Sequence, residues 1–214
     1  MTQSRVLPIT RSRSCIFREA YAIYETAIPK AEQKTRRQML AGLKHPGFRF
    51  WAFEHEGEIA GIAVLYASAA HNTLLLEYLA ISPKLQGKGL GSALFEAAFE
   101  ASRMDGSTLM VIEVDSEKED VSAKEKRIRL SRKAFYRRLG AREVDGFDYI
   151  LPLENFGPAP RMSLLLLGAK ASRIETARLR AAVQDIYANV YRCRTDDPRI
   201  AQMFEGHGRT LKLV

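Results

Sequence analysis

The stretch LLLEYLAISPKLQGKGLGSALFEAAFE, residues 74–100, contains the features that decide the fold. Leu74 to Ile81 is almost entirely apolar and predicts a buried strand, and apolar residues repeat at helical spacing from Leu90 onward. Between the two, Gln86-Gly87-Lys88-Gly89-Leu90-Gly91 places three glycines where the helix begins. The first N–H groups of a helix have no partner within it and attract anions, so this loop is typical of a phosphate-binding site.

Two better-known phosphate-binding motifs do not fit this loop. The P-loop pattern GxxxxGK[ST] is absent, and the dinucleotide fingerprint GxGxxG fails at its third glycine, where Ser92 stands. A dinucleotide loop would also be unusual after three antiparallel strands. A glycine-rich turn that binds no ligand is the structural alternative.

The segments on either side of this stretch predict a mixed sheet. Strand-like runs separated by short turns indicate antiparallel neighbours, and strands that alternate with helices indicate a parallel crossover. We therefore expect an α/β (α+β) fold with a mixed, mostly antiparallel central sheet, one parallel strand pair and flanking helices. The expected strands are residues 6–10, 48–54, 59–68, 74–81, 107–115, 142–153 and 162–167, and the expected helices are 15–26, 31–43, 90–103 and 123–139.

The C-terminal segment predicts a further amphipathic helix over residues 171–192. Its apolar stripe is interpreted as core packing, with a dimer or partner contact as the alternative. We expect a main domain over residues 1–168 and a C-terminal helical extension, residues 169–214, packed on it. The stripe consists of Leu179, Ala182, Val183, Ile186, Tyr187 and Val190.

Two stretches resemble a known family. Gln86-Gly87-Lys88-Gly89-Leu90-Gly91 resembles the Q/R-x-x-G-x-G/A acyl-CoA signature of the GNAT superfamily of N-acyltransferases. The stretch from Ala134 to Ala141, AFYRRLGA, is similar to the A-x-Y-x-x-x-G-F helix end of that superfamily, with Ala141 in place of the usual Phe. The resemblance covers residues 6–167 in element order and is specific only in these two stretches.

The resemblance implies how a donor would bind. In the superfamily a splayed pair of parallel strands, here residues 74–81 and 107–115, receives the pantetheine arm of acetyl-CoA. The implied reaction is direct transfer of the acetyl group to a primary amine of a small-molecule or peptide acceptor, without a metal. Backbone groups near Leu79, Ala80 and Ile81 would pair with the arm, and the pyrophosphate would lie on Gln86, Gly87, Lys88, Gly89, Leu90, Gly91 and the N–H of Ser92.

Glu77 is the candidate general base for this reaction. The attacking amine must be neutral, and an amine with a pKa near ~10 needs a base to take its proton. Glu77 is a carboxylate in the middle of an apolar strand, where a charge is costly unless it is paired or used, and desolvation there raises its pKa. The alternative is an exposed glutamate on the polar face of the strand. Direct action and a relay through water are both left open.

Tyr136 is the candidate acid for the departing CoA thiolate, because the superfamily often has a tyrosine at this position. A phenol with a pKa near ~10 can protonate a thiolate of similar basicity. The alternative is a buried tyrosine that only packs on the cofactor. No cysteine lies in either motif, so an acyl-cysteine intermediate is not expected.

Three further residues are candidates for acceptor binding. Glu113, with Asp115, lies on the opposing parallel strand, where a carboxylate would bind a cationic substrate; a solvated strand end is the alternative. Glu32 follows Pro29 in a region that often covers the acceptor site in the superfamily. Trp51 is a candidate wall of the acceptor pocket, with an aromatic core position as the alternative.

Composition limits the remaining partners. The net charge of +8 suits phosphate groups and also an acidic acyl carrier protein as an alternative donor. The sequence has no basic tract with interleaved aromatic residues, so nucleic-acid binding is not expected. No apolar run is long enough for a membrane span, and no secretory h-region follows the basic N-terminus. Cys15 and Cys193 form no CxxC, so we expect free thiols in the cytoplasm and no metal site. A long-chain acyl-CoA donor and a non-catalytic CoA-binding module are further alternatives.

Overall fold

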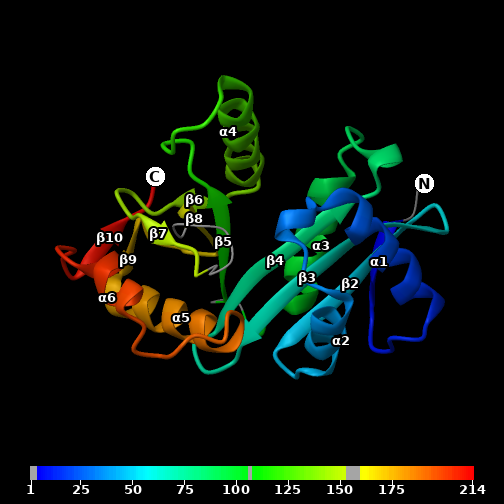
Figure 1. Ribbon diagram of the computed structural model, residues 1–214, viewed down its shortest axis with the longest axis horizontal. Helices are drawn as coiled ribbons and strands as arrows, with labels where there is room; N and C mark the ends of the chain where they lie inside the picture. Colours follow the sequence, from blue (N-terminus) through cyan, green and yellow to red (C-terminus); the bar gives the residue numbers. More distant parts are fainter. Residues whose placement is uncertain (1–3, 106–107, 153–159) are drawn as a thin grey trace. The chain divides into compact units, whose positions relative to one another are not determined.

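The computed structural model of the protein describes residues 4–105, 108–152 and 160–214. The chain forms two compact units. The first unit consists of residues up to 67 together with residues 76–104, and the second unit consists of residues 68–75 together with residues 105–214. The elements of both units are labelled in Figure 1.

The first unit is built on an antiparallel meander. Its strands lie in the order β1-β2-β3-β4, with β1 antiparallel to β2 and β2 antiparallel to β3. The turn between β2 and β3 is short because Glu56 and Gly57 both adopt a positive φ. The strands are β1 (Ser4–Pro8), β2 (Phe48–His55), β3 (Glu58–Ser68) and the part of β4 (Thr73–Ile81) from residue 76 onward.

Helices cover both faces of this meander (Figure 1). Along β2 the side chains alternate, so Phe50 joins the core beneath the first two helices, whereas Trp51 donates its indole N–H to Ser102 on the opposite side at 2.8 Å. The helices are α1 (Cys15–Ala27), η1 (Lys30–Glu32), α2 (Arg36–Lys44), η2 (Pro83–Leu85) and α3 (Leu90–Ser102).

The prediction of one helix over residues 31–43 is wrong at its N-terminal end. The helix α2 begins only at Arg36, because Thr35 and Gln38 form a capping box. The Thr35 hydroxyl accepts from the Gln38 N–H, and the Gln38 side chain accepts from the Thr35 N–H at 2.8 Å. Residues 30–32 form a separate 3₁₀ turn, so residues 28–35 are a connecting segment with a fixed course.

Gly61 lets β3 lie close to the end of β4. A Cβ atom at this position would be 2.7 Å from the Ala80 carbonyl oxygen, 2.7 Å from Ile81 and 3.0 Å from Leu94 of α3. Beside it, the Ser82 N–H donates to the Ala60 carbonyl at 2.8 Å. The glycine therefore fixes the point at which β4 ends and the loop before α3 begins.

The second unit contains β5 and the first three residues of β4. The first residues of β4 lie beside β5, and the Leu109 N–H donates to the Asn72 carbonyl at 3.0 Å. The β4–β5 pair is parallel, whereas β8 runs antiparallel to β5. The elements are β5 (Leu109–Asp115), α4 (Ala123–Arg138), β6 (Arg142–Glu143), β7 (Tyr149–Ile150) and β8 (Arg161–Leu167). The predicted mixed, mostly antiparallel fold is thus confirmed.

Two predictions for this unit need correction. Residues 142–153 do not form one strand, because the chain turns at Gly146, which has a φ of 66°, and leaves β6 and β7 as two short strands on β8. Residue 153 lies outside the described residues, as does residue 107 of the strand expected over 107–115.

The C-terminal segment contains more structure than the single predicted helix. The helix α5 starts at Thr176 and not at residue 171, since Arg173–Glu175 forms a strand, β9, that pairs with β10. The strand over 162–167 is therefore not the last one, and α6 was missed. These elements are α5 (Thr176–Asn189), α6 (Pro198–Phe204) and β10 (Thr210–Lys212).

The C-terminal segment closes onto β6 and β7. Tyr187 of α5 donates its hydroxyl to the Ile150 carbonyl, and the Ile150 N–H points at the Met203 Sδ at 3.1 Å. Glu143 and Val214 exchange two backbone hydrogen bonds of 2.9 Å. The interpretation of the apolar stripe on α5 as core packing is confirmed, because all of its residues are buried: Leu179, Ala182, Val183, Ile186, Tyr187 and Val190.

Candidate active site

Glu77 lies in β4 with its side chain only 9% exposed. Removal from water disfavours the charged carboxylate, so burial raises the pKa of Glu77, and the nearby ammonium of Lys34 opposes that rise. The alternative of a solvent-exposed glutamate therefore does not apply. Its role as the base is not tested by this geometry and stays a prediction.

Lys34 is the residue at this site that sequence reasoning missed. Its Nζ forms an ion pair with Oε1 of Glu77 and lies 5.3 Å from the centroid of the Phe48 ring. The two partners are 43 positions apart in the chain. A lysine in a short loop carries no local pattern that would assign it to a carboxylate so far away.

The glycine loop before α3 has two residues in the left-handed conformation. Gly87 and Gly89 have φ values of 79° and 78°, which side chains rarely tolerate, and a Cβ atom at either position would meet no other atom within 4 Å. The loop is solvent-exposed from Gln86 to Gly89. The backbone of this loop is therefore held in a left-handed conformation at two glycines and is accessible to solvent.

The first turn of α3 begins without a side-chain cap. The cap residue Gly89 is left-handed and has no side chain that could cap the helix. Within the described residues, the N–H groups of Leu90 and Gly91 make no hydrogen bond. The Ser92 N–H, which was also predicted to bind the pyrophosphate, donates to the Gly89 carbonyl at 3.1 Å in this structure.

The end of β4, which leads to this loop, is held in place by burial and by a hydrogen bond to the loop. Ala80 and Ile81 are buried and Leu79 is half-buried. The Gln86 side chain donates to the Ile81 carbonyl at 3.4 Å, which ties the start of the loop to the end of β4. The predicted pairing of this strand end with a pantetheine arm stays a prediction.

Tyr136 lies in the last turns of α4 in the second unit and is 9% exposed. Burial raises the pKa of its phenol to about 12, although the charge of Arg132 acts in the opposite direction. Its ring lies edge-on to that of Phe135, with the two ring centroids 5.0 Å apart. The phenol is therefore protonated throughout the neutral range, as an acid must be before it donates.

The two carboxylates of β5 have partners of their own. Oδ2 of Asp115 accepts from Arg132 at 2.7 Å, and Oε2 of Glu113 accepts from the Tyr191 hydroxyl. Neither residue is a simple solvated strand end. A role of Glu113 in binding a cationic acceptor stays a prediction.

The remaining candidates occupy different surroundings. Glu32 is exposed, and its backbone carbonyl accepts a hydrogen bond from the Tyr78 hydroxyl at 3.0 Å. Trp51 lies on the α3 side of the meander, whereas Phe50 lies on the α1 and α2 side. The structure thus brings Glu77, Glu32 and the glycine loop into the first unit and places Tyr136 and Glu113 in the second.

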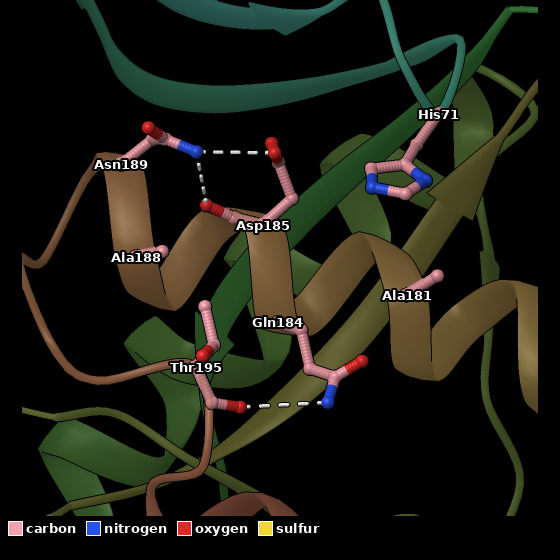
Figure 2. Close-up of a pocket in the computed structure, with 7 residues that line it drawn as sticks. All are labelled: His71, Ala181, Gln184, Asp185, Ala188, Asn189 and Thr195. Atoms are coloured by element: carbon pink, nitrogen blue, oxygen red, sulfur yellow. Dashed lines mark hydrogen bonds between the residues drawn. The ribbon is translucent and has the colours of Figure 1, made fainter.

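A separate cavity of about 250 Å³ lies in the second unit (Figure 2). Residues of α5 line it together with His71 and Thr195, and the Gln184 side chain donates to the Thr195 carbonyl at 3.4 Å. None of the predicted site residues lines this cavity. It is therefore not the site that the sequence motifs indicate.

Residues 46–140 match the model of the Acetyltransferase (GNAT) domain. A putative acetyltransferase of the GNAT family from Bacteroides thetaiotaomicron is 18% identical, with 87% of this chain and 98% of that chain covered and a TM-score of 0.71. No curated protein sequence matches.

Two further solved structures cover 77% of this chain. The ribosomal-protein-S18-alanine N-acetyltransferase from Escherichia coli is 17% identical over 93% of its chain, with a TM-score of 0.55. A Bacillus subtilis acetyltransferase in complex with CoA is 18% identical over 98% of its chain, with a TM-score of 0.52. At these identities the likeness shows the shared fold. In the described part of the chain, no helix has the length and apolar character needed to cross a bilayer.

Proposed function

We propose that this chain, whose residues 46–140 match the Acetyltransferase (GNAT) domain, is an acetyltransferase of that superfamily and transfers the acetyl group of acetyl-CoA directly to a primary amine. The observation that carries the proposal is the glycine loop, with Gly87 and Gly89 left-handed and open to solvent next to the unpartnered N–H groups of α3. The acceptor is proposed to be a small molecule or a peptide. The enzyme is proposed to act in the cytoplasm.

The loop fits the donor chemically. Two backbone N–H groups and the positive end of the α3 dipole lie next to the exposed loop, and Lys88 of that loop adds a positive charge. Gln86 through Gly91 would hold the pyrophosphate, while backbone groups of Leu79, Ala80 and Ile81 would hold the pantetheine arm. When bound, acetyl-CoA supplies a thioester whose carbonyl carbon accepts the amine.

Glu77 is proposed to take the proton of the acceptor amine. A carboxylate in water is too weak a base for an ammonium with a pKa near ~10, and burial narrows that gap by raising the pKa of Glu77. The side chain is 9% exposed, so a proton can also reach it through a water molecule. Glu77 is therefore suited to be the group that makes the amine nucleophilic.

Tyr136 is proposed to return a proton to the sulfur that leaves. The pKa of the phenol is raised to about 12 by burial, which keeps the proton on oxygen until a thiolate forms. The same shift makes the transfer less favourable than it would be for a phenol in water. Glu113, Glu32 and Trp51 are proposed to contact the acceptor. We also propose that residues 1–168 carry the catalytic groups, with residues 169–214 as a C-terminal extension packed on them.

Calorimetric titration with acetyl-CoA tests the donor. We expect one saturable site in the wild type and at least ~10-fold weaker binding in Gly89→Val, a loss of about 1.4 kcal/mol. Gly57→Val is the matched control, because Gly57 has a φ of 83° and equally open surroundings but lies in the β2–β3 turn. The control should bind like the wild type. Equal weakening in both variants would show that backbone strain, and not the loop, causes the loss.

Thiol release with a panel of amines tests the reaction. We expect turnover with at least one amine, and Glu77→Gln should lower kcat about 10²-fold while the affinity for acetyl-CoA stays unchanged. Binding without turnover on any amine would indicate a CoA-binding module. No binding at all would contradict acetyl-CoA as donor, and long-chain acyl-CoA and acyl carrier protein would then be the donors to test.

A further inference from the structure

The segment of residues 28–35 is held in one position over β4. The Tyr24 hydroxyl accepts from the Lys34 N–H at 2.6 Å and donates to the Lys34 carbonyl at 3.4 Å. The Gln33 side chain donates to the carbonyls of Glu25 and Ile28 at 2.9 and 2.7 Å. The backbone of Lys34 is therefore fixed by two separate sets of hydrogen bonds.

The Lys34 side chain runs from this fixed backbone to Glu77. Its ammonium group forms an ion pair with the carboxylate, and its Nζ lies over the face of the Phe48 ring, which attracts a positive charge. The Lys34 side chain is 25% exposed and that of Glu77 is 9% exposed. This is a partly buried ion pair, in which removal of one partner leaves the other charge poorly compensated.

Among the residues that the structure describes, Lys34 is the positive charge that acts on Glu77. The other titratable groups that face this carboxylate are the phenols of Tyr24 on α1 and Tyr78 on β4. Burial raises the pKa of both phenols, so both are neutral in the working range. A buried carboxylate without a cation takes up a proton near neutral pH and can no longer accept one from an amine.

We propose that Lys34 is a positioning residue for the reaction, whose ammonium group keeps the Glu77 carboxylate ionised and oriented so that it can accept a proton. This inference rests on the proposed role of Glu77 as base. The connecting segment of residues 28–35 thus contributes to proton transfer as well as covering β4. Tyr24 contributes indirectly to the position of the ammonium group, because its hydroxyl fixes the backbone from which Lys34 extends.

Lys34→Met tests the inference, since methionine keeps the unbranched stem over Phe48 and removes the charge. Glu77 must be ionised to act, so its protonation sets the acid limb of the pH–rate profile. Loss of the cation raises the pKa of Glu77, and the limb should move to higher pH by about one unit, with about tenfold less activity below the limb. Activity should recover at alkaline pH. Lys34→Arg keeps the charge and should keep the wild-type limb.

A readout without turnover separates this inference from the proposed function. Titration of the Glu77 carboxyl, followed by carbon NMR and assigned with Glu77→Gln, should show the same upward shift in Lys34→Met in the absence of any donor. An unshifted carboxyl overturns the inference even if the enzyme is active. A loss of activity that is equal at every pH in Lys34→Met and Lys34→Arg also overturns it, because only a structural role predicts that result.

Discussion

Tyr136 shows how the surroundings of one side chain change the chemistry expected of it. It is 9% exposed, and burial raises the pKa of its phenol to about 12. The unperturbed value near ~10 would have allowed an alkaline limb in the pH–rate profile. With the raised value, the phenol stays protonated up to pH 11, and this residue should produce no alkaline limb below that pH.

Tyr136→Phe should slow the chemical step and leave binding of acetyl-CoA within twofold, since the ring and its packing are kept. We expect kcat to fall about 10²-fold, a typical value for loss of a general acid. Stopped-flow detection of thiol release and calorimetry would measure the two quantities. Tyr21→Phe is the control, because Tyr21 is also 9% exposed and has no proposed role. Equal rates in Tyr136→Phe and wild type would contradict the acid assignment.

The chemistry of single residues could be predicted from the sequence where it depended on local pattern. Glu77 interrupts an apolar run, and its burial follows from that run. Lys34 could not be predicted, because the hydrogen bonds of Tyr24 that position it depend on how α1 and β4 pack. The internal partners of Asp115 and Glu113 were also missed, because they too depend on how segments distant in the sequence pack together.

Among the elements, α2 depends on its cap. The Thr35 side chain and that of Gln38 satisfy each other's backbone N–H groups, and they begin the helix directly after Lys34. Thr35→Ala should cost about 1 kcal/mol of unfolding free energy, whereas Thr35→Ser should keep most of it. Urea unfolding followed by circular dichroism would measure the difference. Equal stability of the two variants would mean that packing of Met39, and not the cap, fixes the helix.

Element boundaries were predicted well where periodicity was strong. The apolar repeat of α3, the aromatic-rich run of β2 and the apolar run of β3 gave boundaries within two residues of the structure. The boundaries were wrong where a short-range hydrogen bond competes with the pattern, as at the capping box of Thr35 and the turn at Gly146. The pairing of β9 with β10 joins residues 35 or more positions apart, which local periodicity does not reveal.

At the scale of the whole chain, the C-terminal segment is part of a core. Residues 169–214 belong to the same compact unit as β5 and β8, and they cover β7 through Tyr187 and Met203. Since 87% of 214 residues is about 186, the likeness to the Bacteroides protein reaches into this segment. The sequence predicted the helix and its buried stripe, but not that the last residues would pair with β6.

A chain that ends after residue 168 should therefore lose the fold of the second unit. Each fully buried large side chain is worth about 1.5–3 kcal/mol, and removal of α5 and α6 exposes enough of them to exceed a typical stability of about 5–15 kcal/mol. Gel filtration and thermal unfolding would show aggregation or a lost transition. A stable monomer of residues 1–168 that still binds acetyl-CoA would instead establish an independent catalytic domain.

Trp51 has a consequence for observing the molecule in solution. It is the single tryptophan of the chain, and its indole N–H is bound to Ser102, the last residue of α3. Fluorescence excited beyond the tyrosine band therefore comes from the first unit alone and is silent on the second. A red shift of this emission during denaturation marks separation of α3 from β2, and its comparison with circular dichroism distinguishes one cooperative transition from two.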